Sequence, residues 1–195
     1  MTDLALIATE LFHEKQWKKK QLIGVKIRPI KRSDFQQLVE WINAPHVARF
    51  WEGLVDINSV EEKYGSRLDD NAKTRVYVVE VGGQPIGMIQ CYRHIDFPEW
   101  DQTINIERAA GIDYLIGDER YIGRGIGPEM IREIVQTSFN TYSDVDVIVS
   151  APQKDNSASC RALEKAGFTL KEERKLDSAC ISDSGISCIY TFQRP

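Results

Sequence analysis

Three glycines at alternate positions precede a proline and an apolar-periodic segment, in the run 122–135, IGRGIGPEMIREIV. Each glycine weakens regular structure by about 0.5–1 kcal/mol relative to alanine, so this spacing indicates that a ligand must approach the backbone closely. Proline suits the first position of a helix because its missing N–H would be unpaired there. We therefore expect a helix from about 128 to 140 whose free N–H groups and dipole bind a phosphate or diphosphate without a metal. The predicted anion site comprises Gly123, Arg124, Gly125, Ile126, Gly127 and Pro128.

Two better-known glycine motifs do not fit this run. A Walker loop requires GxxxxGK[ST], which is absent, and a dinucleotide fingerprint GxGxxG would need glycine where Pro128 stands. A turn that only connects a strand to a helix remains the alternative.

Length and composition predict one soluble globular domain with an appendage. The 195 residues contain no apolar run near the roughly 20 residues of a membrane span. The formal net charge of −4 argues against non-specific nucleic-acid binding and favours a cationic substrate. Four cysteines without CxxC spacing and three histidines without ligand spacing give no support to a metal site. The amino terminus lacks the basic flank of a secretory signal, so we expect a cytoplasmic protein.

Hydrophobic periodicity divides the chain into an amphipathic helix in residues 1–22 and a domain in residues 23–195. Strands are predicted at 25–30, on both sides of a turn at Gly82-Gly83, and at 109–117, 145–152, 169–176 and 187–193. Further helices are predicted at 35–43, where Ser33-Asp34 can cap the start, at 59–68, from about 128 to 140, and at 156–168. Segments 46–53 and 96–107 are predicted to be turns or loops.

The order of strand, GRGIG, helix, strand and then NSASCRALEKAGF (156–168) resembles the GNAT superfamily of N-acetyltransferases over roughly residues 25–192. In that superfamily a Q/R-x-x-G-x-G/A pattern binds the pyrophosphate of acetyl-coenzyme A. Here the pattern falls on 122–127, with Ile122 where the family has Gln or Arg. The resemblance implies an α/β (α+β) fold with a central mixed, mostly antiparallel sheet of six to seven strands flanked by helices. It also implies acetyl-coenzyme A as co-substrate and a monomer or homodimer.

Four segments are similar, in order, to the aminoglycoside 6'-N-acetyltransferases, namely WINAPHVARFWEG, GQPIGMIQCY, AAGIDYLIG and ALEKAGF. This resemblance implies acetyl transfer to a primary amine of a polycationic aminosugar, and hence antibiotic resistance. It implies that the backbone of Leu115 and Ile116 polarises the thioester carbonyl. Coenzyme contacts then fall on Asn156 and Arg161, and substrate contacts on Trp51, Gln90 and Tyr92. Packing is the alternative for Trp51, and a solvent-facing position is the alternative for Gln90 and Tyr92.

Asp113 is the predicted catalytic base. An amine at pH 7 is mostly protonated and cannot attack a thioester, so a nearby carboxylate must accept its proton. Asp113 interrupts an apolar strand and lies on the face opposite to Ile112 and Tyr114. It also matches the aspartate of the subgroup's G-I-D segment. A structural ion pair of Asp113 with an arginine or lysine remains the alternative.

The segment 96–107 offers three acids next to aromatic residues, Asp96, Glu99 and Asp101 beside Phe97 and Trp100. Carboxylates and aromatic faces together suit several ammonium groups, through ion pairing and cation–π attraction. We predict that these acids bind a polycationic amine. Simple solvation in a loop is the alternative.

Two positions depart from the family pattern. Leu163 stands where the family has a tyrosine that protonates the coenzyme thiolate, so water or another group must do so. Ser150-Ala151-Pro152 replaces T-D-P, which removes an acidic contact. Acyl transfer to another amine, such as a siderophore precursor or a polyamine, and a non-catalytic acyl-coenzyme A-binding module therefore remain open.

Overall fold

The computed structural model describes residues 24–51, 55–176 and 185–195. Its seven strands form one sheet in the order β1-β2-β3-β4-β5-β7-β6. All neighbouring strands are antiparallel except β4 and β5. The mixed, mostly antiparallel sheet predicted from the sequence is confirmed, with seven strands. The amphipathic helix predicted in residues 1–22 lies outside the described residues.

The strands lie close to their predicted positions, and their bounds are β1 Val25–Pro29, β2 Thr74–Val81, β3 Gln84–Arg93, β4 Ala109–Ile116, β5 Val147–Ser150, β6 Thr169–Lys175 and β7 Ile186–Gln193. The β2–β3 hairpin turns at Gly82 and Gly83, whose φ angles are 60° and 81°. A two-residue hairpin turn needs positive φ, which explains glycine at both positions.

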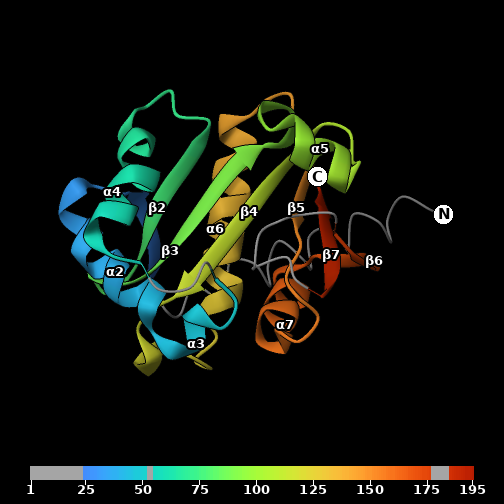
Figure 1. The fold of residues 1–195 in the computed structure, drawn as a ribbon. Coiled ribbons are helices and arrows are strands. Elements are labelled where there is room, and N and C mark those ends of the chain that lie inside the picture. The colour runs from blue at the N-terminus through green and yellow to red at the C-terminus, as the bar shows by residue number, and fades with distance from the viewer. Residues whose placement is uncertain (1–23, 52–54, 177–184) are drawn as a thin grey trace.

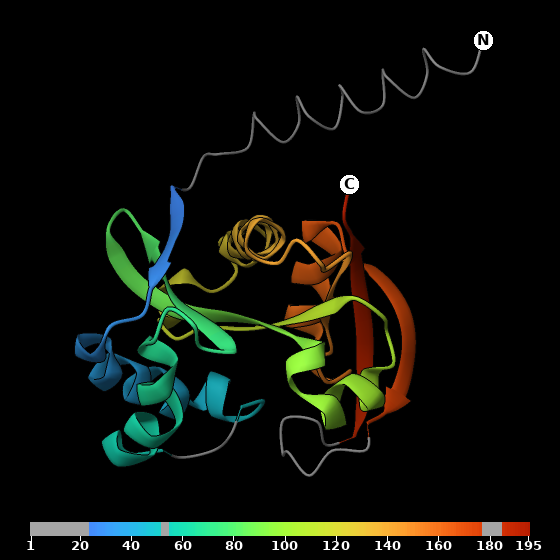
Figure 2. The same ribbon diagram turned by 90° about the horizontal axis from the view of Figure 1, so that it is seen from above.

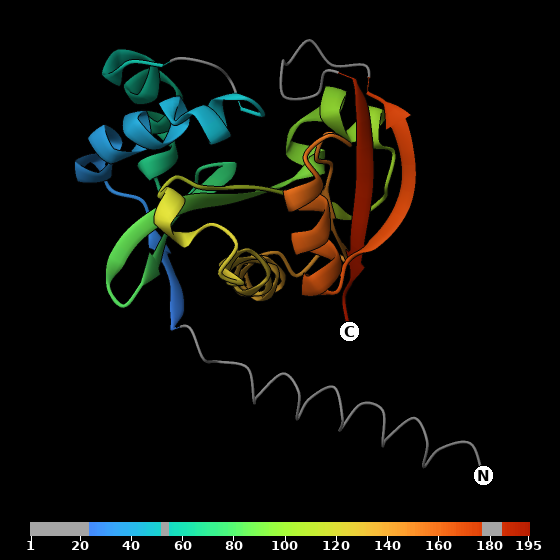
Figure 3. The same ribbon diagram turned by 90° about the horizontal axis from the view of Figure 1, so that it is seen from below.

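Helices cover both faces of the sheet, with bounds α2 Phe35–Asn43, α3 Pro45–Ala48, α4 Ile57–Tyr64, α5 Pro98–Ile104, α6 Ile126–Thr141 and α7 Ser157–Ala166. Figures 2 and 3 show α6 and α7 on one face and α2 to α5 on the other. Each face buries its own hydrophobic cluster, one around α6 and the other around α2 and α4. The sheet is therefore a central layer whose two faces carry different helices.

The sheet opens between β4 and β5, near its centre in Figure 1. The parallel pairing covers Ala109 to Gly111 on β4 and Val147 to Val149 on β5. β4 then continues to Ile116 beside β3, whereas β5 ends at Ser150. Within the described residues, the second half of β4 therefore has a strand on one side and an opening on the other.

Several local predictions need correction. α6 begins at Ile126, so Pro128 is the third helical residue rather than the first, and Gly125 is the N-cap. The segment 96–107 is mostly the helix α5, which begins with Pro98 and carries acids in its first turn, as helix starts favour. Within 46–53, residues up to Ala48 belong to the short helix α3.

The cap predicted for the helix at 35–43 is also different. Asp34 is the N-cap residue of α2, but its carboxylate accepts no capping hydrogen bond from that helix. It accepts hydrogen bonds from the guanidinium of Arg28 at 2.7 and 2.8 Å and from the Lys31 N–H at 2.7 Å. A charged partner on β1 thus competes successfully with the helix end.

Candidate active site

A cleft of about 810 Å³ runs along the opening between β4 and β5. Its lining comes from β3, β4 and β5, from the starts of α6 and α7, and from α3, α4 and α5. We call the part formed by the α6 start and α7 the coenzyme half, and the part formed by α3, α4, β3 and the residues around α5 the acceptor half. Asp113 to Ile116 of β4 lie between the two halves.

The turn before α6 has the backbone expected of an anion site. Gly123 and Gly125 have φ angles of 74° and 81°, and Gly125 caps a helix of 16 residues. Residues with a Cβ adopt this left-handed conformation only at a cost, which explains glycine here. The lining includes every predicted anion-site residue except Arg124, which is exposed. The contribution of Arg124 therefore stays a prediction, and the donors that line the cleft here are main-chain N–H groups at the start of α6.

One stripe of α7 supplies the positive charge of the coenzyme half. The N-cap residue Asn156 lines the cleft, and its side chain accepts a hydrogen bond from the Ser159 N–H at 3.2 Å. Arg161 lines the cleft one turn further along, and Lys165 follows at helical spacing. The lining thus includes Asn156 and Arg161, both predicted from the sequence. Lys165 was missed, although its i+4 spacing from Arg161 was a usable signal.

Alternation along β4 sends consecutive side chains to opposite faces of the sheet. Leu115 is buried with the cluster around α2 and α4, on the face that Asp113 also occupies. Tyr114 and Ile116 pack against the cluster around α6 instead. The carbonyl of Ile116 accepts a hydrogen bond from Nε2 of His46 at 2.8 Å, which ties α3 to the end of β4. Asp113 and Tyr114 therefore lie on opposite faces of the sheet, both at the β4 edge of the opening.

Asp113 is held by a neighbouring strand. Gln90 is its cross-strand partner on β3, and Nε2 of Gln90 donates a hydrogen bond to Oδ2 of Asp113 at 2.8 Å. Oε1 of Gln90 in turn accepts from Arg67 at 2.9 Å. The hydrogen bonds from Arg67 to Gln90 and from Gln90 to Asp113 thus orient the carboxylate through the neutral amide of Gln90. The guanidinium of Arg67 lies behind that amide.

Aromatic side chains form the wall of the acceptor half. Tyr92 lies across Gly111, where an added Cβ would come within 2.5 Å of its ring. The Tyr92 ring stacks on His94 at 6.0 Å between centroids and meets Phe97 edge-on at 5.4 Å. Trp51 and Trp100 also line the cleft. Their indole N–H groups are buried and have no hydrogen-bond partner among the described residues.

His94 is a buried titratable group in this wall. Its ring meets Trp100 edge-on at 6.4 Å, and neither ring nitrogen has a partner among the described residues. Burial disfavours the charged form and lowers the pKa of His94 from 6.5 to about 4. The imidazole is therefore neutral at physiological pH.

The three acids predicted to bind substrate are not part of the cleft lining. Asp96 accepts two hydrogen bonds from Arg93, both at 3.0 Å. Glu99 and Asp101 lie in the first turn of α5, where negative charge stabilises the helix dipole. Binding of a polycationic amine by these acids therefore stays a prediction, and in this structure α5 turns Trp100 rather than Glu99 or Asp101 toward the cleft.

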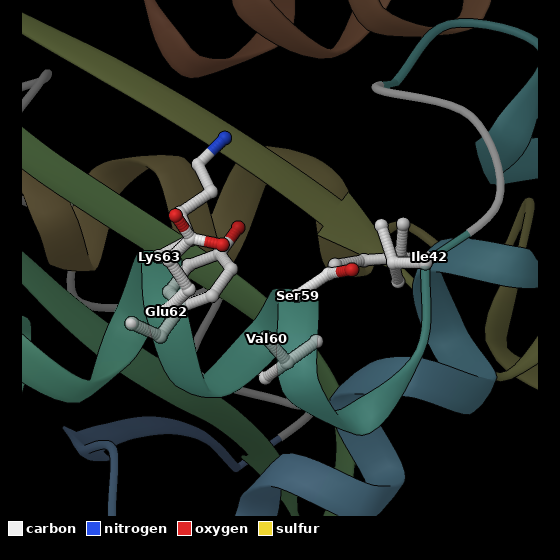
Figure 4. A pocket seen from close by; sticks show the side chains of 7 residues that line it. Ile42, Ser59, Val60, Glu62 and Lys63 are labelled. Atoms are coloured by element: carbon white, nitrogen blue, oxygen red, sulfur yellow. The ribbon is translucent and has the colours of Figure 1, made fainter.

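The described lining is rich in basic residues. It includes Arg49, Lys63, Arg161 and Lys165, whereas Asp113 is the only acidic residue among the described lining residues. Figure 4 shows the side chain of Lys63 rising away from α4, and Lys63 also borders a smaller hollow of about 330 Å³ next to α2 and α4. The acceptor half therefore presents two cationic side chains, Arg49 and Lys63, next to the one carboxylate of Asp113 at its border.

Comparison with known proteins identifies the family. Residues 31–176 match the model of the acetyltransferase (GNAT) domain. The chain belongs to the GNAT family. It is 28% identical over 149 residues to an aminoglycoside N(6')-acetyltransferase type 1 of Klebsiella pneumoniae, covering 74% of each chain. It is 23% identical to the spermidine N(1)-acetyltransferase of Escherichia coli K12, covering 77% of this chain and 75% of the relative.

A solved structure shares the fold. The aminoglycoside acetyltransferase AAC(6')-Ib in complex with coenzyme A and kanamycin superposes with a TM-score of 0.75 at 25% identity, covering 87% of this chain and 95% of that one. The GNAT fold predicted from the sequence is thereby confirmed.

GNAT enzymes use acetyl-coenzyme A as co-substrate, and the residues present fit its diphosphate. A Cβ added at Gly123 would meet nothing within 4 Å, so the backbone there is open to a ligand. The N–H groups at the α6 start and the cations of Arg161 and Lys165 would hold the negative charge. Among the described residues, no three His, Cys, Asp or Glu side chains are placed to hold a metal ion. No helix in the described part of the chain is long and apolar enough to cross a bilayer.

The cleft of this GNAT protein also includes residues that sequence reasoning missed, namely His46, Arg49, Phe50, Lys63, His94, Tyr114 and Ser159. Trp100, predicted from the sequence as an aromatic face for the acceptor, lines the cleft from α5. The helix itself had a signal, because Pro98 followed by acidic residues is typical of a helix start. Nothing in the local sequence marks Arg49 or His94, whose positions depend on packing of α3 and the end of β3 against the opening.

Proposed function

We propose that this GNAT protein transfers the acetyl group of acetyl-coenzyme A to a primary amine, with the 6'-amino group of an aminoglycoside as acceptor, and thereby confers resistance to such antibiotics. The observation that carries the proposal is a single cleft that joins the α6 anion site, the opened edge of β4 and Asp113. The similarity to aminoglycoside N(6')-acetyltransferases supports the acceptor.

Asp113 accepts the proton of the incoming ammonium. The amine must be neutral to attack the thioester, and a positioned carboxylate can remove its proton at the site. Gln90 fixes Oδ2 of Asp113, so the carboxylate keeps one orientation during the transfer. Trp51 and Tyr92 line the same half of the cleft and give the acceptor flat apolar surfaces to pack against.

The opened edge of β4 holds the thioester. Main-chain N–H groups of Leu115 and Ile116 are the proposed donors to the carbonyl oxygen as negative charge develops on it. The α6 start, Asn156 and Arg161 bind the diphosphate end of the coenzyme. With the coenzyme held in this way, the acetyl carbon would lie beside Asp113 before any bond changes.

Thiol release from acetyl-coenzyme A tests the proposal, with kanamycin, tobramycin, spermidine and lysine as separate acceptors. Turnover with the aminoglycosides and acetylation at the 6' position, identified by mass spectrometry and NMR, are the expected results. Expression in a susceptible bacterium should raise the inhibitory concentration of the same drugs. Coenzyme binding without turnover on any amine would instead indicate a non-catalytic binding module.

The charge of the acceptor half favours a second candidate, an amine that carries its own carboxylate. Arg49 and Lys63 line this half, whereas Asp96, Glu99 and Asp101 do not. A carboxylate on the substrate would be attracted by these cations, and a polycation would be repelled by them. Turnover with lysine or a hydroxylysine derivative, but not with aminoglycosides, would select this candidate.

A further inference from the structure

Tyr114 links β4 to the start of α7 across the opening of the sheet. It lies on β4 beyond the last residue pair that β4 shares with β5. Its hydroxyl lies 2.6 Å from the hydroxyl of Ser159 in the first turn of α7. Both residues line the cleft. A pair of hydroxyl groups therefore sits where the opening of the sheet meets the coenzyme half.

Acetyl transfer leaves an electron pair on the coenzyme sulfur, and that sulfur needs a hydrogen-bond donor. Leu163 is fully buried in the core and carries no polar hydrogen. Tyr92 and Gln90 belong to the acceptor half, on the side of β3. Tyr114 and Ser159, in contrast, lie between β4 and α7.

We propose that the hydroxyl of Tyr114, held in place by Ser159, donates a hydrogen bond to the coenzyme sulfur as the thiolate forms. This inference rests on the acetyl transfer proposed above and adds a residue to it. Either hydroxyl can donate in the Tyr114–Ser159 pair, and the Tyr114 hydroxyl also lies 3.4 Å from the Ser159 carbonyl oxygen. In the proposed complex Ser159 donates to the oxygen of Tyr114, and the tyrosine hydrogen turns from that long contact to the sulfur. The adjacent residue Asp113 serves the amine on the opposite face of the same strand.

The bond changes balance without a proton from Tyr114. The amine nitrogen forms a bond to the acetyl carbon, and the carbon–sulfur bond breaks with its electron pair on sulfur. Asp113 passes the first ammonium proton to solvent before the attack, so its carboxylate is ionised again when the amide forms and takes the second proton of the nitrogen. The sulfur leaves as a thiolate, whose conjugate acid has a pKa of about 8.5 in cysteine-like thiols. Tyr114 stays protonated throughout.

The surroundings of Tyr114 support a donor that stays neutral. Burial raises the pKa of Tyr114, partly offset by the hydrogen bond with Ser159, and the nearby Cys160 and Asp113 raise it further. Hydrogen bonds to a charged group are the stronger ones, so a neutral donor facing a thiolate stabilises that thiolate effectively.

The test measures the pKa of the coenzyme A thiol bound to the protein, from the ultraviolet absorbance of the thiolate during a pH titration. The complex with desulfo-coenzyme A provides the baseline, because it removes the absorbance of the protein's own cysteines. We expect the bound thiol of the wild type to titrate about one pH unit below free coenzyme A, a tenfold gain in thiolate. In Tyr114→Phe the pKa of the bound thiol should rise most of the way back to that of free coenzyme A. In Ser159→Ala it should rise by a smaller amount.

Tyr142→Phe is the matched control, since Tyr142 is also a buried tyrosine with a hydrogen-bonded hydroxyl but does not line the cleft. It should keep the wild-type titration. An unchanged thiol pKa in Tyr114→Phe, with coenzyme binding retained, would overturn the inference. Should that variant not fold, an unchanged pKa in Ser159→Ala would overturn it as well. Failure of the wild type to bind coenzyme A would refute the acetyl transfer itself, which is a distinguishable result.

Discussion

The coenzyme half and the acceptor half of the cleft are built in different ways. The coenzyme half uses main-chain N–H groups at one helix start and side chains from one stripe of α7, all within residues 123–165. The acceptor half gathers side chains from α3, α4, β3 and α5, which are joined only by the register and packing of the sheet. The coenzyme half thus depends on local backbone conformation, whereas the acceptor half depends on contacts between residues far apart in the sequence.

This difference predicts separable effects. Changes in the coenzyme half should alter the affinity for coenzyme A, whereas changes in the acceptor half should alter turnover and leave that affinity unchanged. Isothermal titration with coenzyme A and steady-state thiol release measure the two quantities independently.

The largest effect is expected for Asp113→Asn. Without a carboxylate to accept the amine proton, kcat/KM for the acceptor should fall by about 10²–10⁴-fold, while the Kd for coenzyme A stays the same. Asp70→Asn, an exposed aspartate in the turn before β2, is the control and should retain full activity. A fully active Asp113→Asn enzyme would remove the base from the proposal.

The next largest effect is a loss of folding stability at low pH, caused by His94 in the acceptor half. His94 takes up a proton near pH 6.5 in the unfolded chain but only near pH 4 in the folded protein, so the unfolded state binds more protons between these values. The contribution of neutral His94 to the free energy of unfolding is therefore fully present above pH 6.5. It is lost as the pH falls toward 4, and the loss is at most about 3 kcal/mol.

Urea denaturation at pH 7 and pH 4.5 checks this prediction. His94→Leu should lose less free energy of unfolding between the two pH values than the wild type does. Equal losses in both proteins would show that His94 is accessible to protons in the folded state.

A smaller effect is expected for Gln90→Leu, which removes the donor to Oδ2 of Asp113. A hydrogen bond to a charged group contributes about 1.5–3 kcal/mol, so kcat/KM should fall by about 10- to 150-fold. Gln84→Leu, at the exposed start of the same strand, should behave as the wild type. If Gln90→Leu weakened coenzyme binding instead, the separation of the two halves would be wrong.

The smallest effect is expected for Gly123→Ala in the coenzyme half. The left-handed backbone makes any Cβ cost roughly 1–2 kcal/mol, and the added methyl group would face the ligand. Coenzyme affinity should fall by severalfold. Gly82→Ala in the β2–β3 turn has the same positive φ and the same open space, so it should lower stability similarly and leave coenzyme binding unchanged.

The sequence predicted much of the fold because its signals are local. The Gly82-Gly83 hairpin, the Asn156 cap of α7 and the glycine after that helix all act within a few residues. The start of α6 was misplaced by two residues, because Pro128 is tolerated anywhere in the first turn. The segment 96–107 was predicted as a loop because its acids outweighed the helix-start signal of Pro98.

The sequence by itself determined the glycine turn before α6, the order of strands and helices, and an acid in the middle of β4. These follow from backbone conformation and hydrophobic period, which neighbouring residues set. Only the tertiary structure decided that Gln90 and Arg67 hold Asp113, that Trp100 faces the cleft in place of the acids beside it, and that Tyr114 meets Ser159. Such contacts join residues far apart in the chain, and their geometry is fixed by sheet register and by the opening between β4 and β5.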